Sequence, residues 1–427
     1  MKKKEENNIM SEEIRKAVIF QLYNKKKLMF DEGVLPYYVE DDAPADYIVS
    51  KYGEIRSVKD LLNEDDEQSG HYEIDSVADM WEDYANELNK IKKRKPVDIG
   101  FSELQKTIKG ALIKGLIVIG AAPSAGKTTL ISQWAYNIAK SGRDVLIVSL
   151  EMAKSELITR DLSRLTFAMT TSQDKRNKNK ALTLPEIYTR KSFTAGAETN
   201  LTEEQKTAFK NAVKEYKEVS KHIFIAEPED IADIPPLTDV SADAIKQAVK
   251  IMTEENGQAP IVFVDYLQLL SSPYDGARCV YTDERRLNNH NVHIFKEISQ
   301  EFNVPVFAVS STSRTGYNQV DNEAFAKESG GIEYAADATL FIQYAEAHKK
   351  TKQEDREKAI KTGQAKSKRE MTISVLKNRA GERNKHFTYD YYAPYYFFDA
   401  ENERTDNKKA VDNNDDDDDD DYDVIEV

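Results

Sequence analysis

The sequence predicts an α/β protein with a mainly parallel, doubly wound sheet, and three observations lead to this prediction. The chain has 427 residues, which is enough for roughly two or three domains. After residue 96, short apolar segments alternate with amphipathic helical segments. Apolar residues in these segments do not alternate with polar ones. Such continuous apolar runs are typical of parallel strands that are buried on both faces. They are GLIVIG, DVLIVSL, HIFIAE, PIVFVDYL, VPVFAVSS, ATLFIQY and MTISVLKN.

The part of the chain before this region differs in character. SEEIRKAVIFQLYNKKKLM and DSVADMWEDYANELNKIKKRK show helical spacing, and the second follows an aspartate that can cap a helix. Acidic, turn-rich pieces lie between them, and Pro96 ends the basic helix. We therefore expect a small, mostly helical accessory region over residues 1–95 and the α/β domain over residues 96–400.

The charge of the chain is concentrated at its end. The net charge is −15, but the segment from Val411 onward holds nine aspartates and one glutamate without a basic residue. Such a run repels itself and stays solvated, so we expect residues 401–427 to form a disordered acidic tail. The tail either keeps the protein soluble or acts by mimicking nucleic acid or docking through its apolar tip.

Composition excludes several classes of site. Cys279 is the single cysteine, so the chain forms no internal disulfide, and a reducing compartment is expected. With only six histidines and no clustered ligand spacing, we predict no zinc site. The basic start lacks an apolar signal region, and the segment GALIKGLIVIGAA is shorter than the ~20 residues of a membrane span and contains a lysine. We expect a cytoplasmic protein without membrane contact.

The segment GAAPSAGKTTL, residues 120–130, lies between an expected strand and an expected helix. From Ala121 it fits the pattern of Ala or Gly, four residues, Gly-Lys, and then Ser or Thr. Small residues let successive backbone N–H groups face a phosphate, and the helix N-terminus adds partial positive charge. Lys127 would reach the β- and γ-phosphates, and the Thr128 hydroxyl would coordinate Mg²⁺. The predicted nucleotide-binding residues are Ala121, Ala122, Pro123, Ser124, Ala125, Gly126, Lys127, Thr128 and Thr129.

Two carboxylates follow apolar strands and complete the predicted site. Asp265 ends the strand in PIVFVDYL and would provide the second Mg²⁺ anchor, although an aspartate at this place also serves as a turn former. Glu151 ends the strand in DVLIVSLE and would orient or activate water. As an alternative, Glu151 is a first-turn residue of the following helix, where the helix dipole favours it.

Together the motifs resemble a known family. AAPSAGKTTL, VSLEMAKSEL, IVFVDYLQLL, FNVPVFAVSSTSR, ESGGIEYAADATLFI and VLKNRAGE occur in the order of the motor domain of DnaB-type replicative helicases. The resemblance runs from about Val97 to Asp399, and DYLQL and SLEM with KNRAG make it specific. It implies a RecA-like P-loop ATPase fold with ATP and Mg²⁺ as cofactors, in a phage-like or mobile-element-like member of the family.

The resemblance also implies roles for single residues. Lys127 and Glu151 look like catalytic residues, and Lys377 and Arg379 look like the pair that reaches the γ-phosphate of the neighbouring subunit. A guanidinium supplied by a neighbour stabilises charge in the transition state and makes hydrolysis depend on assembly. From the residues alone, the favoured interpretation is that the pair consists of exposed charges at a strand end.

DnaB-type helicases form hexameric rings around a DNA strand, which implies single-stranded DNA and further copies of this chain as partners, together with primase or a loader protein. The expected DNA-binding loops are SSPYDGARCVYTDERR and SRTGYNQVDNEAFAKES, where Arg278, Arg314 and Lys327 would meet phosphates. The expected activity is ATP-driven movement on DNA or its unwinding.

Several features depart from the family pattern. Ser311 stands where the family usually has glutamine, the first 95 residues do not match the family's N-terminal domain, and the polar segment beginning at TTSQDKRNKNK is atypical. Two alternatives therefore stay open. One is a RecA-like recombinase that closes a filament on DNA, and the other is a regulatory or loader ATPase that binds DNA or a protein without unwinding.

Overall fold

The chain divides into two compact units, Met1–Arg94 and Lys95–Val427, and each is described by itself. The computed structural model describes residues 47–49, 55–57, 76–78, 80–92, 94–121, 124–171, 181–188, 201–234, 239–275, 278–311, 334–350 and 352–405.

In the first unit, the described residues form one helix and one strand pair. Helix α3 (Trp81–Lys92) lies within the second segment with helical spacing. Strands β1 (Tyr47–Val49) and β2 (Ile55–Ser57) pair antiparallel, which the sequence pattern did not predict. The other predicted helix, over residues 11–29, lies outside the described residues.

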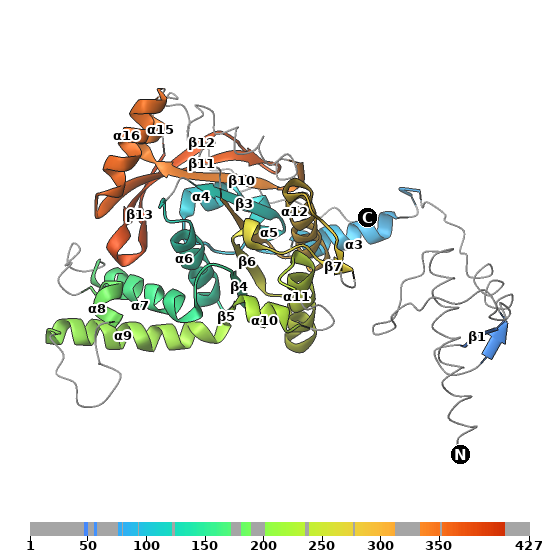
Figure 1. Cartoon of the computed structure of the whole chain (residues 1–427). Coiled ribbons are helices and arrows are strands. Elements are labelled where there is room, and N and C mark those ends of the chain that lie inside the picture. The colour runs from blue at the N-terminus through green and yellow to red at the C-terminus, as the bar shows by residue number, and fades with distance from the viewer. Residues whose placement is uncertain are drawn as a thin grey trace, which may run out of the picture. The chain divides into compact units, whose positions relative to one another are not determined.

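The second unit is built on a nine-stranded sheet with the order β13-β12-β11-β10-β3-β9-β6-β4-β5 (Figure 1). The six strands from β10 to β5 are parallel, and all seven predicted apolar segments form strands of this sheet. The parallel strands are β3 (Leu116–Ala121), β4 (Val145–Ser149), β5 (Ile223–Ala226), β6 (Ile261–Asp265), β9 (Val306–Ser311) and β10 (Ala338–Tyr344).

An antiparallel extension continues the sheet beyond β10. It consists of β11 (Lys368–Asn378), β12 (Lys385–Tyr392) and β13 (Phe397–Thr405). Only β11 was expected. Because β13 continues to Thr405, residues 401–405 belong to the sheet and not to the acidic tail, which corrects the predicted boundary. Residues 406–427, which carry the aspartate run, lie outside the described residues.

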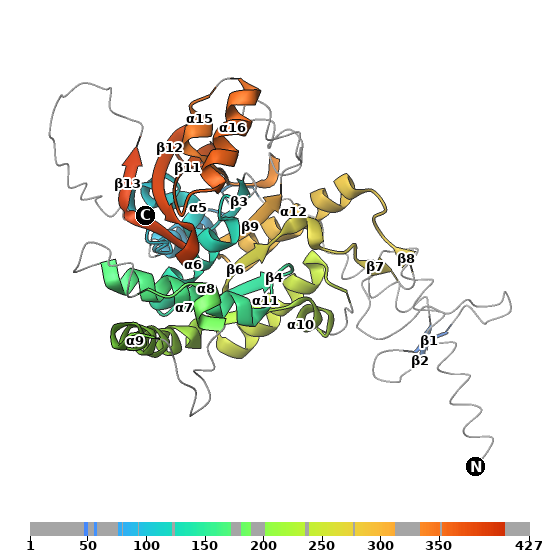
Figure 2. The same cartoon turned by 60° about the vertical axis from the view of Figure 1, so that its left-hand side comes forward.

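Helices cover both faces of the sheet (Figures 1 and 2). Helix α6 packs with α7 and α9, whereas α11 packs with α12. Right-handed crossovers explain this division, because the chain moves along the sheet in opposite directions in the two groups. The bounds are α6 (Lys127–Lys140), α7 (Lys154–Thr171), α9 (Glu203–Val219), α11 (Ala242–Asn256) and α12 (Glu284–Glu301).

Shorter elements complete the unit. The charged segment before β11, expected as a loop or surface helix, forms α16, and the predicted polar segment after α7 lies largely outside the described residues. Among the described helices, none combines the length and apolar character needed to cross a bilayer. The short elements are α4 (Ser102–Thr107), α5 (Lys109–Ile113), α8 (Leu184–Tyr188), α10 (Pro228–Ala232), α15 (Ala345–His348), α16 (Gln353–Gln364), β7 (Tyr274–Asp275) and β8 (Arg278–Cys279).

Aromatic packing fixes α6 to the centre of the sheet. Trp134 on α6 is fully buried, and its ring centroid lies 5.8 Å from that of Phe307 on β9. Phe307 in turn stacks on Phe263 of β6 at 4.5 Å. Such ring pairs add to the stabilisation that comes from burial alone. The helix that begins at the P-loop is therefore held in register with the strands that carry the other predicted site residues.

Candidate active site

The described part of the predicted phosphate-binding loop, between β3 and α6, contains two residues with positive φ. Gly126 caps α6 with a left-handed conformation (φ 88°, ψ 31°), and Ser124 also has positive φ, at 55°. Glycine suits this position, because this φ strains any other residue and a Cβ atom would lie 3.1 Å from the rings of Phe398 and Tyr391. Lys127 is the first residue of α6. Ala122 and Pro123 lie outside the described residues.

Thr128 and Asp265 meet above the carboxyl edge of the sheet. The Thr128 hydroxyl donates a 2.6 Å hydrogen bond to Oδ2 of Asp265, which is the last residue of β6. Burial raises the pKa of Asp265, and the bond from Thr128 opposes this effect. The turn of α6 that follows the loop and the end of β6 are thereby joined across β9.

Lys127 and Glu151 surround this pair. Glu151 is exposed and follows β4, where Ser149 pairs with Asp265 in parallel register. Burial lowers the pKa of Lys127, while the negative charges of Asp265 and Glu151 raise it. Glu151 also raises the pKa of Asp265. The structure thus brings together the four predicted residues Lys127, Thr128, Glu151 and Asp265.

The oxygens at this edge fit a magnesium ion. Oδ1 of Asp265 is buried and has no hydrogen-bond partner among the described residues. A buried carboxylate oxygen without a partner is costly, and a cation removes this cost. Mg²⁺ binds through one or two protein oxygens together with the phosphates of a nucleotide. The Thr128 hydroxyl and the Asp265 carboxylate are suitable for such a site.

Arg379 lies at the opposite edge of the sheet. Asn378 pairs with Ala338 at the start of β10, and Ala338 pairs with Ile117 near the start of β3. From Ile117 to Ala121, where the loop begins, a strand rises about 13 Å. Arg379 therefore cannot reach the loop of its own chain. Lys377, which pairs with Thr339, lies in the same part of β11.

The guanidinium of Arg379 is held near Asp337, which precedes β10. Nη1 of Arg379 lies 3.6 Å from Oδ1 of Asp337, and Nη2 donates to the carbonyl of Tyr334. Asp337 also accepts a bond from Lys296 and from the backbone N–H of Leu116. The Arg379 side chain stays 49% exposed, so it is available to another molecule.

The predicted DNA-binding loops follow neighbouring strands. β6 and β9 pair in parallel, so the segments after them leave from the same edge as the phosphate-binding loop. Arg278 lies in β8, which pairs antiparallel with β7. Arg314 and Lys327 lie outside the described residues. Ser310 and Ser311, at the end of β9, precede the second predicted loop. Ser310 accepts a 2.8 Å hydrogen bond from Gln268, and for Ser311 the structure describes only the backbone.

Sequence reasoning missed an aromatic wall behind the loop. Tyr391 and Phe398 stack at 4.4 Å beside Gly126, and the Tyr391 hydroxyl lies 3.4 Å from that of Thr129. Gln133 on α6 bonds to both the N–H and the carbonyl of Phe398, at 3.0 and 2.8 Å. The aromatic density of FTYDYYAPYYFF was the available signal. The partners of these rings, however, are far away in the sequence.

Comparison with known proteins identifies the family to which this chain belongs. A model of the DnaB-like helicase C-terminal domain matches residues 96–398, well over half of the chain. The chain belongs to this family. The replicative DNA helicase DnaB of Pasteurella multocida is 28% identical over 257 residues, which is 59% of this chain and 47% of that protein. The chain therefore spans about half the length of the curated relatives it matches.

Solved structures support the fold of this DnaB-like domain. One solved ATPase domain matches with a TM-score of 0.54 and 21% identity, over 76% of this chain and 98% of that chain. A DnaB-like replicative helicase, solved in a study of its interactions with primase, matches with the same score and identity over 80% and 71%. The predicted RecA-like fold is confirmed, and the N-terminal unit lies outside the family match.

Proposed function

We propose that this chain is the motor of an ATP-driven DNA helicase or translocase that works as a ring, with hexamers as the expected assembly. The observation that carries the proposal is the Thr128–Asp265 hydrogen bond, with Lys127 and Glu151 around it, at the edge of the sheet opposite to Arg379. Each chain would carry the nucleotide-binding residues of a catalytic site at one edge of the sheet and Arg379 at the other. Two copies arranged head to tail would combine them.

In this proposal the backbone N–H groups from Ser124 to Thr128 hold the β-phosphate of ATP, and Lys127 neutralises the developing charge on the γ-phosphate. Thr128 and Asp265 would hold a Mg²⁺ ion, which would supply Lewis-acid stabilisation of the phosphate charge. Glu151, which is exposed beside them, accepts a proton from the attacking water.

Assembly supplies the last catalytic group. Arg379 of one subunit would leave Asp337 and approach the γ-phosphate held by the next, with Lys377 beside it. Hydrolysis would then release the contact between Arg379 and the γ-phosphate. The loops after β6 and β9 would move with the edge of the sheet that carries the phosphate-binding loop. Heterologous contacts between identical chains form a ring where the rotation between neighbours closes, and a hexamer is one such ring.

The partners follow from the same proposal. Single-stranded DNA would pass along the loops that contain Arg278, Arg314 and Lys327, where basic side chains meet phosphates. Residues 1–95 would form an accessory region, and primase or a loader protein is the partner we propose for the assembly. A cytoplasmic location is part of the same proposal.

A strand-displacement assay on forked DNA tests the proposal, with ATP hydrolysis measured in parallel. We expect the full chain to hydrolyse ATP with Mg²⁺, to be stimulated by single-stranded DNA, and to release the displaced strand. The Lys127→Ala variant should abolish both signals and serves as the control for contaminating enzymes. Stimulated hydrolysis without displacement would favour a recombinase or loader ATPase, and absence of hydrolysis would reject the proposal.

A further inference from the structure

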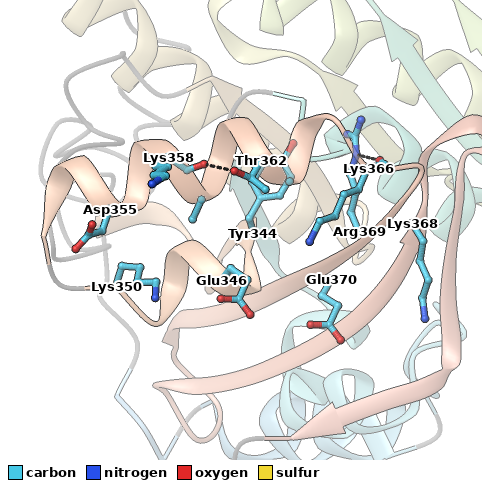
Figure 3. Close-up of a pocket in the computed structure, with 12 residues that line it drawn as sticks. Tyr344, Glu346, Lys350, Asp355, Lys358, Thr362, Lys366, Lys368, Arg369 and Glu370 are labelled. Carbon is cyan, nitrogen blue, oxygen red and sulfur yellow. Dashed lines mark hydrogen bonds between the residues drawn. The ribbon is translucent and has the colours of Figure 1, made fainter.

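The helices α15 and α16 connect β10 to β11 and, together with the start of β11, line a half-open cavity of about 510 Å³ (Figure 3). β10 and β11 pair directly, with Tyr344 opposite Met371, so a short turn would be enough to join them. The two helices are therefore an addition that the sheet does not require. Two residues that flank these helices, Tyr344 at the end of β10 and Arg369 near the start of β11, bond to the loop.

Arg369 connects the end of α16 with the loop. Its Nε donates to the carbonyl of Lys366 at 3.0 Å, and its Nη2 donates to the carbonyl of Gln364 at 2.8 Å. Its Nη1 donates to the carbonyl of Ser124 at 3.0 Å. One guanidinium thus joins two segments that are far apart in the sequence. The fork of five N–H donors makes arginine suited to this task.

Tyr344 provides a second bond to the same carbonyl. Its hydroxyl donates to the Ser124 oxygen at 3.1 Å, and burial raises its pKa, so the hydroxyl keeps its proton. Helix α16 is seated tightly on this ring, because a Cβ atom on Gly363 would lie 2.5 Å from it. In Figure 3, Tyr344, Lys366 and Arg369 lie together between α16 and the start of β11.

Fixing the Ser124 carbonyl also fixes the next amide. A trans peptide bond is planar, so the N–H of Ala125 points away from the side on which the Ser124 oxygen lies. Two donors hold that oxygen against Tyr344 and Arg369. The Ala125 N–H is consequently turned the other way, which is the direction a phosphate acceptor requires. The positive φ of Ser124 is stabilised by the same two bonds.

We propose that Arg369 is a positioning residue that couples the α15–α16 helices to the phosphate-binding loop and holds the Ala125 amide ready for nucleotide. The proposal rests on the proposed function only in requiring that the loop binds a nucleotide. Arg369 does not touch the phosphate in this account. It acts through the Ser124–Ala125 peptide, with Tyr344 as the second support.

Titration of the full chain with a fluorescent ADP analogue and Mg²⁺ tests the proposal. Arg369→Ala should weaken binding about tenfold, since a charge-assisted hydrogen bond is lost from the support of the loop. Arg369→Lys should not restore binding, because one ammonium group cannot reach three carbonyls in two segments. At saturating ATP, kcat should change less than KM, because the amide holds the phosphate equally in ground and transition states.

Two further variants separate positioning from charge and from folding. Lys366→Ala removes a positive side chain from the same cavity but keeps the carbonyl that Arg369 contacts, so its affinity should equal that of the unmodified chain. Tyr344→Phe removes one hydroxyl and should weaken binding about threefold. It decides the matter if Arg369→Ala does not fold in a thermal melt. A third variant, with residues 347–364 replaced by a short Gly-Ser linker, should weaken binding as Arg369→Ala does.

The outcomes are distinct. If the unmodified chain binds no nucleotide, the proposed function fails. If it binds and the Arg369 and Tyr344 variants bind equally well, the coupling proposal is overturned while the function stands. Equal weakening by Lys366→Ala would also overturn it, because the effect would then be one of general charge.

Discussion

Asp265 meets two opposing requirements at the end of β6. Its carboxylate is suited to a metal ion, yet the residue is nearly fully buried. Because burial raises its pKa above the ordinary value of 3.8, the protonated form is favoured in the fold. The stability that this group contributes is complete below the unfolded pKa and is lost as pH rises through the folded pKa.

We therefore predict that Asp265→Asn raises the thermal stability of the unliganded chain and that the gain grows from pH 3.8 upward. The amide keeps an acceptor for Thr128 but carries no charge. The same variant should lose the extra stabilisation that Mg²⁺ and ADP give to the unmodified chain. Thermal melts across pH, with and without ligand, measure both effects. A destabilised unliganded variant would contradict the prediction.

For Glu151 the expectation is different, because the side chain is exposed. Glu151→Gln should leave the melting temperature and nucleotide affinity close to those of the unmodified chain. Turnover should fall by at least a factor of about 100, the usual contribution of a general base. Steady-state hydrolysis and ADP titration measure the two properties separately. Retained turnover would show that another group activates water.

The strands differ in how well the sequence predicts them. β4, β6 and β9 are continuous apolar runs because both of their faces are buried, so composition alone predicts them. β12 and β13 contain charged residues such as Asp390 and Glu403, whose pairing with Arg404 and Tyr389 forms only after folding. A similar difference holds within the site. Lys127 and Thr128 lie in one contiguous motif and are predicted from it, whereas Arg369 and Tyr391 reach the loop only in the folded chain and are not predicted.

The close contact of β12 and β13 with the loop gives a matched pair of glycine tests. Gly126 and Gly142 lie at opposite ends of α6 and have similar φ values of 88° and 83°. A Cβ atom meets two rings at Gly126, but at Gly142 nothing lies within 4 Å. Alanine at either place should cost about 1 kcal/mol of backbone strain.

Only Gly126→Ala should also displace the rings of Phe398 and Tyr391 and remove nucleotide binding. Chemical denaturation gives the stability of each variant, and fluorescent ADP titration gives its affinity. Equal affinity in the two variants would show that the aromatic wall does not constrain the loop.

Under the proposed function, the separation of Arg379 from the loop of its own chain would require each copy of the protein to complete the site of a neighbour. Each variant that lacks one half of the site should be inactive alone: Lys127→Ala because it holds no nucleotide, and Arg379→Ala because it binds ATP without turnover. In a mixture, a subunit with an intact loop meets a neighbour with an intact Arg379 at about a quarter of randomly formed interfaces.

We predict that mixing the two variants restores measurable hydrolysis, while each variant alone stays inactive. Mass photometry with ATP and Mg²⁺ should show that the mixture forms the same assemblies as the unmodified chain. Full turnover by Arg379→Ala alone would exclude a role for this residue between subunits.

The wall behind the loop also sets an order of events during synthesis. Gln133 and Phe398, which bond to each other, are 265 residues apart. At about 5–20 residues per second, a ribosome needs on the order of tens of seconds to travel that distance. During this interval the nascent loop has left the ribosome without its backing, so a growing chain should capture nucleotide only after β13 has been synthesised.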